Sequence, residues 1–127
     1  MTSKISPRLG RQETRILQVL WRCGATPVRR ITEALNAEPS AAPMAHSTVQ
    51  TLLRKLEAKG AVTHHEEGRV FLFSASLPET QAIESAADEL LGRVFGGSVF
   101  GLVAHFLQRE DLTDAERERL RTLIDRS

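Results

Sequence analysis

The sequence predicts a mainly α-helical protein with one small β-hairpin, and three observations lead to this fold class. Apolar residues recur at intervals of three and four over most of the 127 residues, which is the spacing of amphipathic helices. Between residues 61 and 75 the pattern changes to two short strand-like runs on either side of the turn sequence EEG. The hydrophobic content of 41% and the charged content of 26% are typical of globular proteins, and the length allows one domain or two very small ones.

Three features indicate a cytoplasmic protein of bacterial type. No run approaches the ~20 apolar residues that a membrane helix needs. The first residues, MTSKISPRLGRQE, lack the apolar stretch of a signal peptide. Cys23 is the only cysteine, so no internal disulfide can form, and its place on an apolar helix face predicts a small buried side chain rather than a redox switch.

Two helices are expected between residues 13 and 36. The apolar face of the first, residues 13–22, consists of Ile16, Leu17, Leu20 and Cys23, with Trp21 expected in the core. Gly24 follows in the position typical of a helix C-terminus. We expect Thr26 to cap the second helix and Pro27 to be its first residue, where the missing N–H costs nothing. That helix would end near Asn36 and bury Val28, Ile31, Ala34 and Leu35.

The third expected helix, residues 46–60, has two faces of different chemistry. Its apolar stripe consists of Val49, Leu52, Leu53 and Leu56. Its other side carries hydroxyls, an amide and a guanidinium, with no acid before Glu57. A solvated helix usually mixes both signs of charge, so this donor-rich face suggests contact with an electron-rich partner.

The hairpin completes a recognisable order of elements. Residues 61–65 and 70–75 are strand-like, and Gly68 between them can take a positive φ angle. The turn NAEPSAAPMA separates the second helix from the third, because its two prolines forbid regular helix. Helix, helix, turn, helix and hairpin together make a winged helix-turn-helix. In that fold the third helix is free to enter a DNA major groove.

The net charge of +1 divides unevenly along the chain. Residues 1–75 hold 11 of the 17 Lys and Arg and 6 of the 16 Asp and Glu, a net +5, whereas residues 76–127 have a net −4. We therefore expect a DNA-binding domain over residues 1–75 and a different role for residues 76–127. Chance variation in surface charge is the alternative.

The last third predicts a three-helix dimerisation domain over residues 76–127. One helix begins at about Leu77 and is broken by Gly96-Gly97, and another is opened by the capping box Thr113-Asp114-Ala115-Glu116. Between them SVFGLVAHFL is apolar on nearly every side, so it must be covered all round. Three small helices cannot provide that cover, and a second copy of the chain is its simplest source. The expected dimer interface consists of Leu91, Phe95, Val99, Phe100, Leu102, Val103, Phe106, Leu107, Leu120, Leu123 and Ile124.

Four stretches resemble the BlaI/MecI penicillinase-repressor family. They are LGRQETRILQVLWRCGATPVRRITEAL, STVQTLLRKLEAKGAV, EEGRVFLFSA and the LVAHFL segment after the paired glycines, and together they run from about Leu9 to the C-terminus. The resemblance implies a homodimeric winged-helix repressor of palindromic operators. It also implies release from DNA when a membrane-bound, β-lactam-sensing metalloprotease signals cleavage in the dimerisation helices.

Two departures from the family pattern bear on the signal. Its proteolysed members carry an Asn-Phe pair where this chain has His105-Phe106, so cleavage there and β-lactam as the inducer stay open. Related copper-responsive repressors carry a C-terminal Cys-x-Cys cluster, and the corresponding stretch ERERLRTLIDRS has no cysteine. We therefore expect no copper sensing by that device.

The candidate DNA-binding residues fall into two groups. Gln can pair with adenine and Arg with guanine in the major groove, while hydroxyls and lysines reach bases or phosphates. From the third helix this set comprises Ser47, Thr48, Gln50, Thr51, Arg54 and Lys55, with Lys55 and Lys59 nearer the DNA backbone. Expected phosphate contacts outside that helix are Arg69 at the wing tip, Arg11 or Arg8 in the N-terminal arm, and Arg29 or Arg30 at the start of the second helix.

Enzyme and metal chemistry are not expected. The sequence has no Gly-x-Ser-x-Gly elbow, P-loop, His-Glu-x-x-His or Rossmann glycine pattern, and we expect no cofactor. His64 and His65 would point to opposite faces of a strand, so they cannot bind one ion together. Two other functions stay open. One is a winged-helix regulator that senses a ligand or metal, and the other is a winged helix used for protein interaction.

Overall fold

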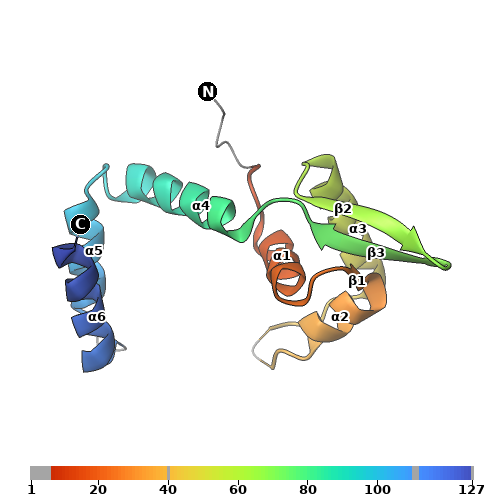
Figure 1. Ribbon diagram of the computed structural model, residues 1–127, viewed down its shortest axis with the longest axis horizontal. Coiled ribbons are helices and arrows are strands. Elements are labelled where there is room, and N and C mark those ends of the chain that lie inside the picture. The colour runs from red at the N-terminus through yellow and green to blue at the C-terminus, as the bar shows by residue number, and fades with distance from the viewer. Residues whose placement is uncertain (1–6, 40, 110–111, 127) are drawn as a thin grey trace. The chain divides into compact units, whose positions relative to one another are not determined.

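The computed structural model describes residues 7–39, 41–109 and 112–126, and these contain six helices and three strands (Figure 1). The chain divides into two compact units, one that ends at Ser85 and one that begins at Ala86. The division falls inside helix α4 (Glu79–Val94). Each unit is described by itself below.

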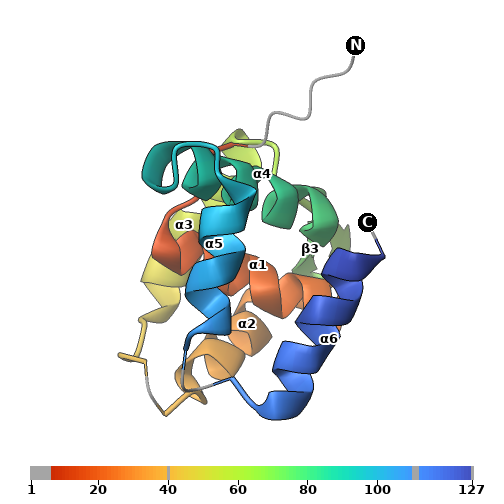
Figure 2. The same ribbon diagram turned by 90° about the vertical axis from the view of Figure 1, so that its left-hand side faces the viewer.

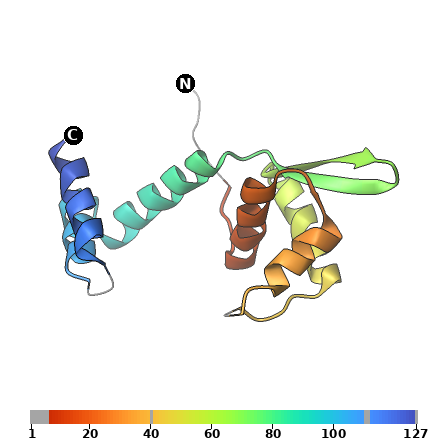
Figure 3. The ribbon, with the colours of Figure 1, turned by 60° about the horizontal axis from the view of Figure 1, so that its bottom comes forward.

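The first unit is a winged helix. Its helices are α1 (Arg11–Cys23), α2 (Val28–Asn36) and α3 (His46–Ala58), and its strands are β1 (Thr26–Pro27), β2 (Val62–Glu67) and β3 (Val70–Ala75). The strands form an antiparallel sheet in the order β1-β3-β2. Figure 3 shows the β2–β3 hairpin, the wing, extending away from the three helices. The expected order of three helices and a hairpin is confirmed.

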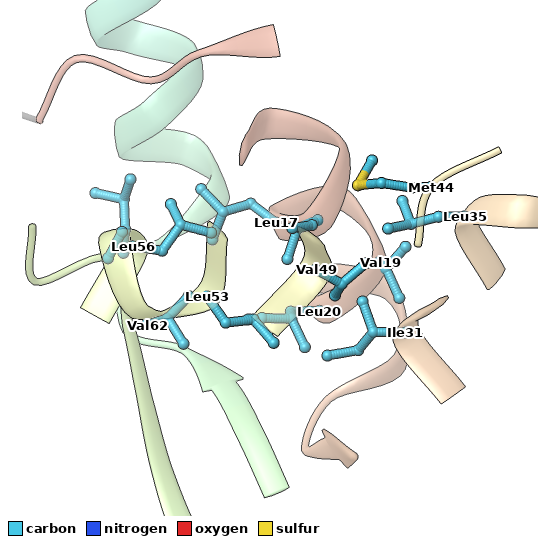
Figure 4. Close-up of a cluster of buried hydrophobic side chains, with 13 residues drawn as sticks. Leu17, Val19, Leu20, Ile31, Leu35, Met44, Val49, Leu53, Leu56 and Val62 are labelled. Atoms are coloured by element: carbon cyan, nitrogen blue, oxygen red, sulfur yellow. The ribbon is translucent and has the colours of Figure 1, made fainter. Parts of the chain in front are cut away.

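The core of this unit lies where the apolar faces of the three helices meet (Figure 4). The stripe of α3 is at its centre, since Val49, Leu53 and Leu56 are fully buried. Burial of side chains of this size contributes about 1.5–3 kcal/mol each, so the stripe fixes which side of α3 faces outward. The other buried members are Ile16, Leu17, Val19, Leu20, Ile31, Leu35, Met44, Ala61, Val62 and Leu77.

The N-terminus of α2 differs from the expectation. Thr26 does not cap the helix; it pairs with Phe73 of β3, and its hydroxyl donates to the Gly24 carbonyl at 2.6 Å. Pro27 is the N-cap rather than the first helical residue, with extended φ and ψ of −76° and 158°. The expectation was wrong because the backbone of Thr26 and Pro27 is used by a third strand, and a two-residue strand leaves no alternating pattern to detect.

Two side chains of α1 also differ from the expectation. Cys23 is exposed, because the buried stripe ends at Leu20 and the chain turns away at Gly24, whose φ is 77°. Trp21 is half-buried at the edge of the core, where its indole N–H donates to the Leu77 carbonyl at 2.8 Å.

The second unit contains the end of α4, α5 (Val99–Leu107) and α6 (Asp114–Asp125) (Figure 2). The expected capping box is confirmed: Thr113 N donates to Glu116 Oε1 and Glu116 N donates to Thr113 Oγ1, both at 3.0 Å. Ser98 caps α5 by accepting from Gly101 N at 2.9 Å. Among the described helices, no single one has the length and apolar character to cross a membrane. The α4–α5 pair would pass that test only jointly, and it is bent by 97° at its break.

Candidate nucleic-acid interface

The outward face of α3 carries the polar residues that the sequence singles out. All six side chains are exposed: Ser47, Thr48, Gln50, Thr51, Arg54 and Lys55. The cap of the helix is Ala45, so neither early hydroxyl is consumed by capping. Thr51 Oγ1 donates to the Ser47 carbonyl at 3.1 Å, which orients one hydroxyl along the helix. The face therefore combines one amide, one guanidinium, one ammonium and three hydroxyls.

The wing ends in a tight turn at Gly68-Arg69. Gly68 has a φ of 66°, as the sequence predicts, and this conformation suits a two-residue hairpin turn. Arg69 is consequently exposed at the tip. Two glutamates, Glu66 and Glu67, precede the turn, and His65 Nε2 lies 3.3 Å from Glu67 Oε2.

Four further arginines named from the sequence, Arg8 among them, are exposed on the first unit. Arg29 and Arg30 lie in the first turn of α2. Arg11 begins α1 and lines a shallow surface hollow together with Lys55 of α3, with Lys59, which caps the C-terminus of α3, and with Glu13. The fold therefore brings Arg11, Lys55 and Lys59 to one place, where the charge of Lys59 is paired with Glu13.

Lys59 has a role that the sequence did not predict. Its ammonium donates to Glu13 Oε1 and to the Arg8 carbonyl, both at 2.7 Å, so it joins the end of α3 to the start of α1. Glu13 is only 5% exposed and also accepts from Gly10 N at 2.8 Å. A capping box is usually recognised by a Ser or Thr three residues before the Glu. Gly10 occupies that position here, so the sequence pattern did not reveal the role of Glu13.

The Glu13–Lys59 pair favours the charged carboxylate. Burial alone would raise the pKa of Glu13, but it is outweighed by hydrogen bonds from Lys59 and Gly10 N and by the charges of Lys59 and Lys55. The pKa is therefore held below its ordinary value of 4.5. A carboxylate with a lowered pKa stabilises the folded state above its unfolded pKa, and this contribution is lost as the pH falls through the folded pKa.

We expect Glu13→Gln to lower the free energy of unfolding at pH 7 by about 1–2 kcal/mol, since it removes a charged acceptor in a buried site. The loss should shrink as the pH falls below 4.5 and through the lowered pKa of Glu13, since the carboxylate of the wild type then becomes protonated itself. Urea unfolding at several pH values measures both effects. Glu38→Gln is the control, because Glu38 pairs with Arg15 at 2.9 Å but is 57% exposed, and it should change stability little. Equal losses at acidic and neutral pH would contradict the assignment.

The adjacent histidines of the wing have separate partners. His64 Nδ1 lies 2.7 Å from Glu57 Oε2 on α3, whereas His65 faces Glu67 on its own strand. Over the residues that the structure describes, no group of three His, Cys, Asp or Glu side chains could hold a metal ion.

The second unit has a different kind of surface, which is apolar. Phe100 is 83% exposed, Leu123 62%, Val94 60% and Val99 59%. No residue of α4 or α5 is buried. Among the expected interface residues, Phe106 is also exposed, and those that are half-buried are Leu91, Phe95, Leu102, Val103, Leu107 and Leu120. The side chain of Ile124 lies outside the described residues. His105, at the pair discussed for cleavage, is exposed and contacts the rings of Phe95 and Phe106.

Comparisons with known proteins agree with this fold. A family model described as "Penicillinase repressor" matches residues 9–126. The penicillinase repressor of Bacillus licheniformis is 28% identical over 94% of this chain and 91% of its own. The methicillin resistance regulatory protein MecI of Staphylococcus aureus is 22% identical over 90% of both chains.

A solved structure matches more than half of the chain. It is the solution structure of monomeric BlaI from Bacillus licheniformis in complex with the blaP half-operator, at a TM-score of 0.51 and 27% identity. The match covers 61% of this chain and 90% of that chain. Because the family model spans nearly all of the sequence, this chain belongs to the penicillinase repressor family.

Proposed function

We propose that this protein is a transcriptional repressor that binds double-stranded operator DNA as a homodimer. The observation that carries the proposal is the outward face of α3, where six hydrogen-bonding side chains are exposed opposite a fully buried stripe. An exposed helix of this kind fits the major groove. The relative from Bacillus licheniformis, whose structure is described as a complex with a half-operator, supports the same use of the fold.

The side chains divide into base readers and phosphate contacts. Gln50 and Arg54 have the donors and acceptors to read adenine and guanine edges. Ser47, Thr48, Thr51 and Lys55 flank them and contact bases or the adjacent phosphates. Arg69 on the wing, Arg29 on α2 and Arg11 on α1 bind phosphates without reading sequence.

Dimerisation through the second unit would supply affinity and symmetry. Its exposed phenylalanines, valines and leucines exceed what a small monomeric unit normally leaves in water. A second copy of the chain covers them and holds two α3 helices for two half-sites. The operator is then a pseudo-palindrome with half-sites one helical turn apart or a small multiple of it.

Release from DNA would act on the same helices. The relatives named penicillinase repressor and methicillin resistance regulatory protein support a regulator of antibiotic resistance in the cytoplasm. His105-Phe106 lies on α5 within the proposed dimer interface, so cleavage there by a protease activated indirectly by a membrane-bound sensor would separate the two copies. Another signal acting on these helices would have the same effect.

A gel-shift titration with the DNA upstream of the protein's own gene tests the repressor function. We expect binding that weakens steeply with salt, and footprints on two symmetric half-sites. Genome-wide mapping of bound DNA with and without a β-lactam then identifies the regulated genes and tests the signal. A folded dimer without affinity for any promoter fragment would contradict the proposal.

A further inference from the structure

His64 lies at the root of the wing, where the sheet narrows. β1 supports β3 only at Phe73 and Leu72, and His64 and His65 of β2 are the partners of these two residues on the other side. From Glu66 outward the hairpin has two strands only. A two-stranded ribbon is marginally stable in water on its own. The direction of the wing therefore depends on what holds this root.

The side chain of His64 joins three elements at that root. Its Nδ1 atom lies 2.7 Å from Glu57 Oε2 in the last turn of α3. Its ring lies against Phe71 and Phe73 of β3, with ring centroids 4.9 and 5.3 Å away. His65, one residue later, points to the other face and pairs with Glu67 inside the wing. Of the two histidines, His64 is the one that contacts α3.

The position of the wing tip is sensitive to this contact. Arg69 lies five residues beyond His64, or about 17 Å at the rise of a strand. A rotation of about 10° at the root would move the tip by about 3 Å. The donor–acceptor distance of a hydrogen bond to a phosphate can vary by only a few tenths of an ångström, so a rotation of that size breaks the bond.

We propose that His64, acting through Glu57, is a positioning residue that fixes the wing relative to α3 and so lets Arg69 and α3 engage DNA together. The inference rests on the proposed function for its effect on DNA, but the fixed wing is a property of the free protein. The pair is about one-third exposed on both sides, so it adds little to folding stability. Its effect is on geometry.

The first test needs no DNA. Spin labels at the exposed Cys23 and at Arg69→Cys report the distance from α1 to the wing tip by pulsed EPR. We expect a narrow distance distribution that broadens with His64→Ala or Glu57→Ala. The matched controls are His65→Ala and Glu67→Ala. They remove an imidazole and a carboxylate from the His65–Glu67 pair, and they should leave the distance distribution narrow. Equal distributions in all four variants would overturn the proposal.

The second test measures coupling to Arg69 on operator DNA. His64→Ala should lower affinity about fivefold, as expected for one lost contact, whereas His65→Ala should not. Arg69→Ala should weaken binding clearly in the wild-type and His65→Ala backgrounds and much less in the His64→Ala background, because the tip is already displaced. Thermal unfolding should be nearly the same for both histidine variants.

The outcomes separate this proposal from the proposed function. Equal effects of Arg69→Ala in every background would overturn the positioning role while leaving DNA binding intact. A wild-type protein that binds no promoter DNA would refute the repressor function. In that case a distribution that broadens only with His64→Ala and Glu57→Ala would still support the fixed wing.

Discussion

Phe100→Asp is expected to convert the protein to a monomer and to lower its affinity for a complete operator about a hundredfold or more. Phe100 is 83% exposed in α5, so it contributes little to the stability of the monomer. In a dimer its side chain would be buried. A carboxylate there would have to lose its water, which costs several kcal/mol without a partner. Once the dimer is lost, the second half-site no longer benefits from the high effective concentration set by the first.

Sedimentation measures the oligomeric state, and gel shifts on one and two half-sites measure the affinity. Affinity for a single half-site should be unchanged, because the substitution is in the second unit and the proposed reading surface is in the first. Ile83→Asp is the control: Ile83 is 59% exposed in the first unit, and the same acid there should leave the dimer intact. A dimer that survives Phe100→Asp would contradict the proposed interface.

The sequence predicted the parts of the fold that local pattern encodes. The α3 stripe at Val49, Leu53 and Leu56 is fully buried because helical periodicity alone determines which side meets the core. The Thr113 capping box and the positive φ of Gly68 follow from side-chain and backbone preferences within a few residues. For the same reason the outward face of α3 could be named in advance, since it is what the stripe leaves free.

The sequence did not predict the features that depend on distant partners. Thr26 is drawn into a strand by Phe73, far along the chain. Lys59 is tied to Glu13 and the Arg8 carbonyl across the start of α1, so a lysine expected to face DNA is part of the internal structure. Cys23 satisfies the helical period and is still exposed, because periodicity does not say where the covering helices end. Each error concerns tertiary packing rather than local propensity.

Arg54→Ala should cost about 1–3 kcal/mol of operator binding per half-site and relax the preference at one base pair. Arg54 is exposed on the outward face of α3, and a guanidinium in the major groove reads guanine through two hydrogen bonds. Competition binding with operators changed at each position measures the preference.

Arg69→Ala is the matched comparison, since it removes the same guanidinium from the wing. It should weaken binding to all operator sequences alike, because a phosphate contact carries no sequence information. It should also flatten the dependence of affinity on salt, because a phosphate contact releases counterions when it forms. If Arg54 reads a base, the two variants should differ in how their affinity depends on the operator sequence. If both lose affinity uniformly over all operator variants, α3 holds DNA by its charge alone, and the sequence preference must come from other side chains or from DNA shape.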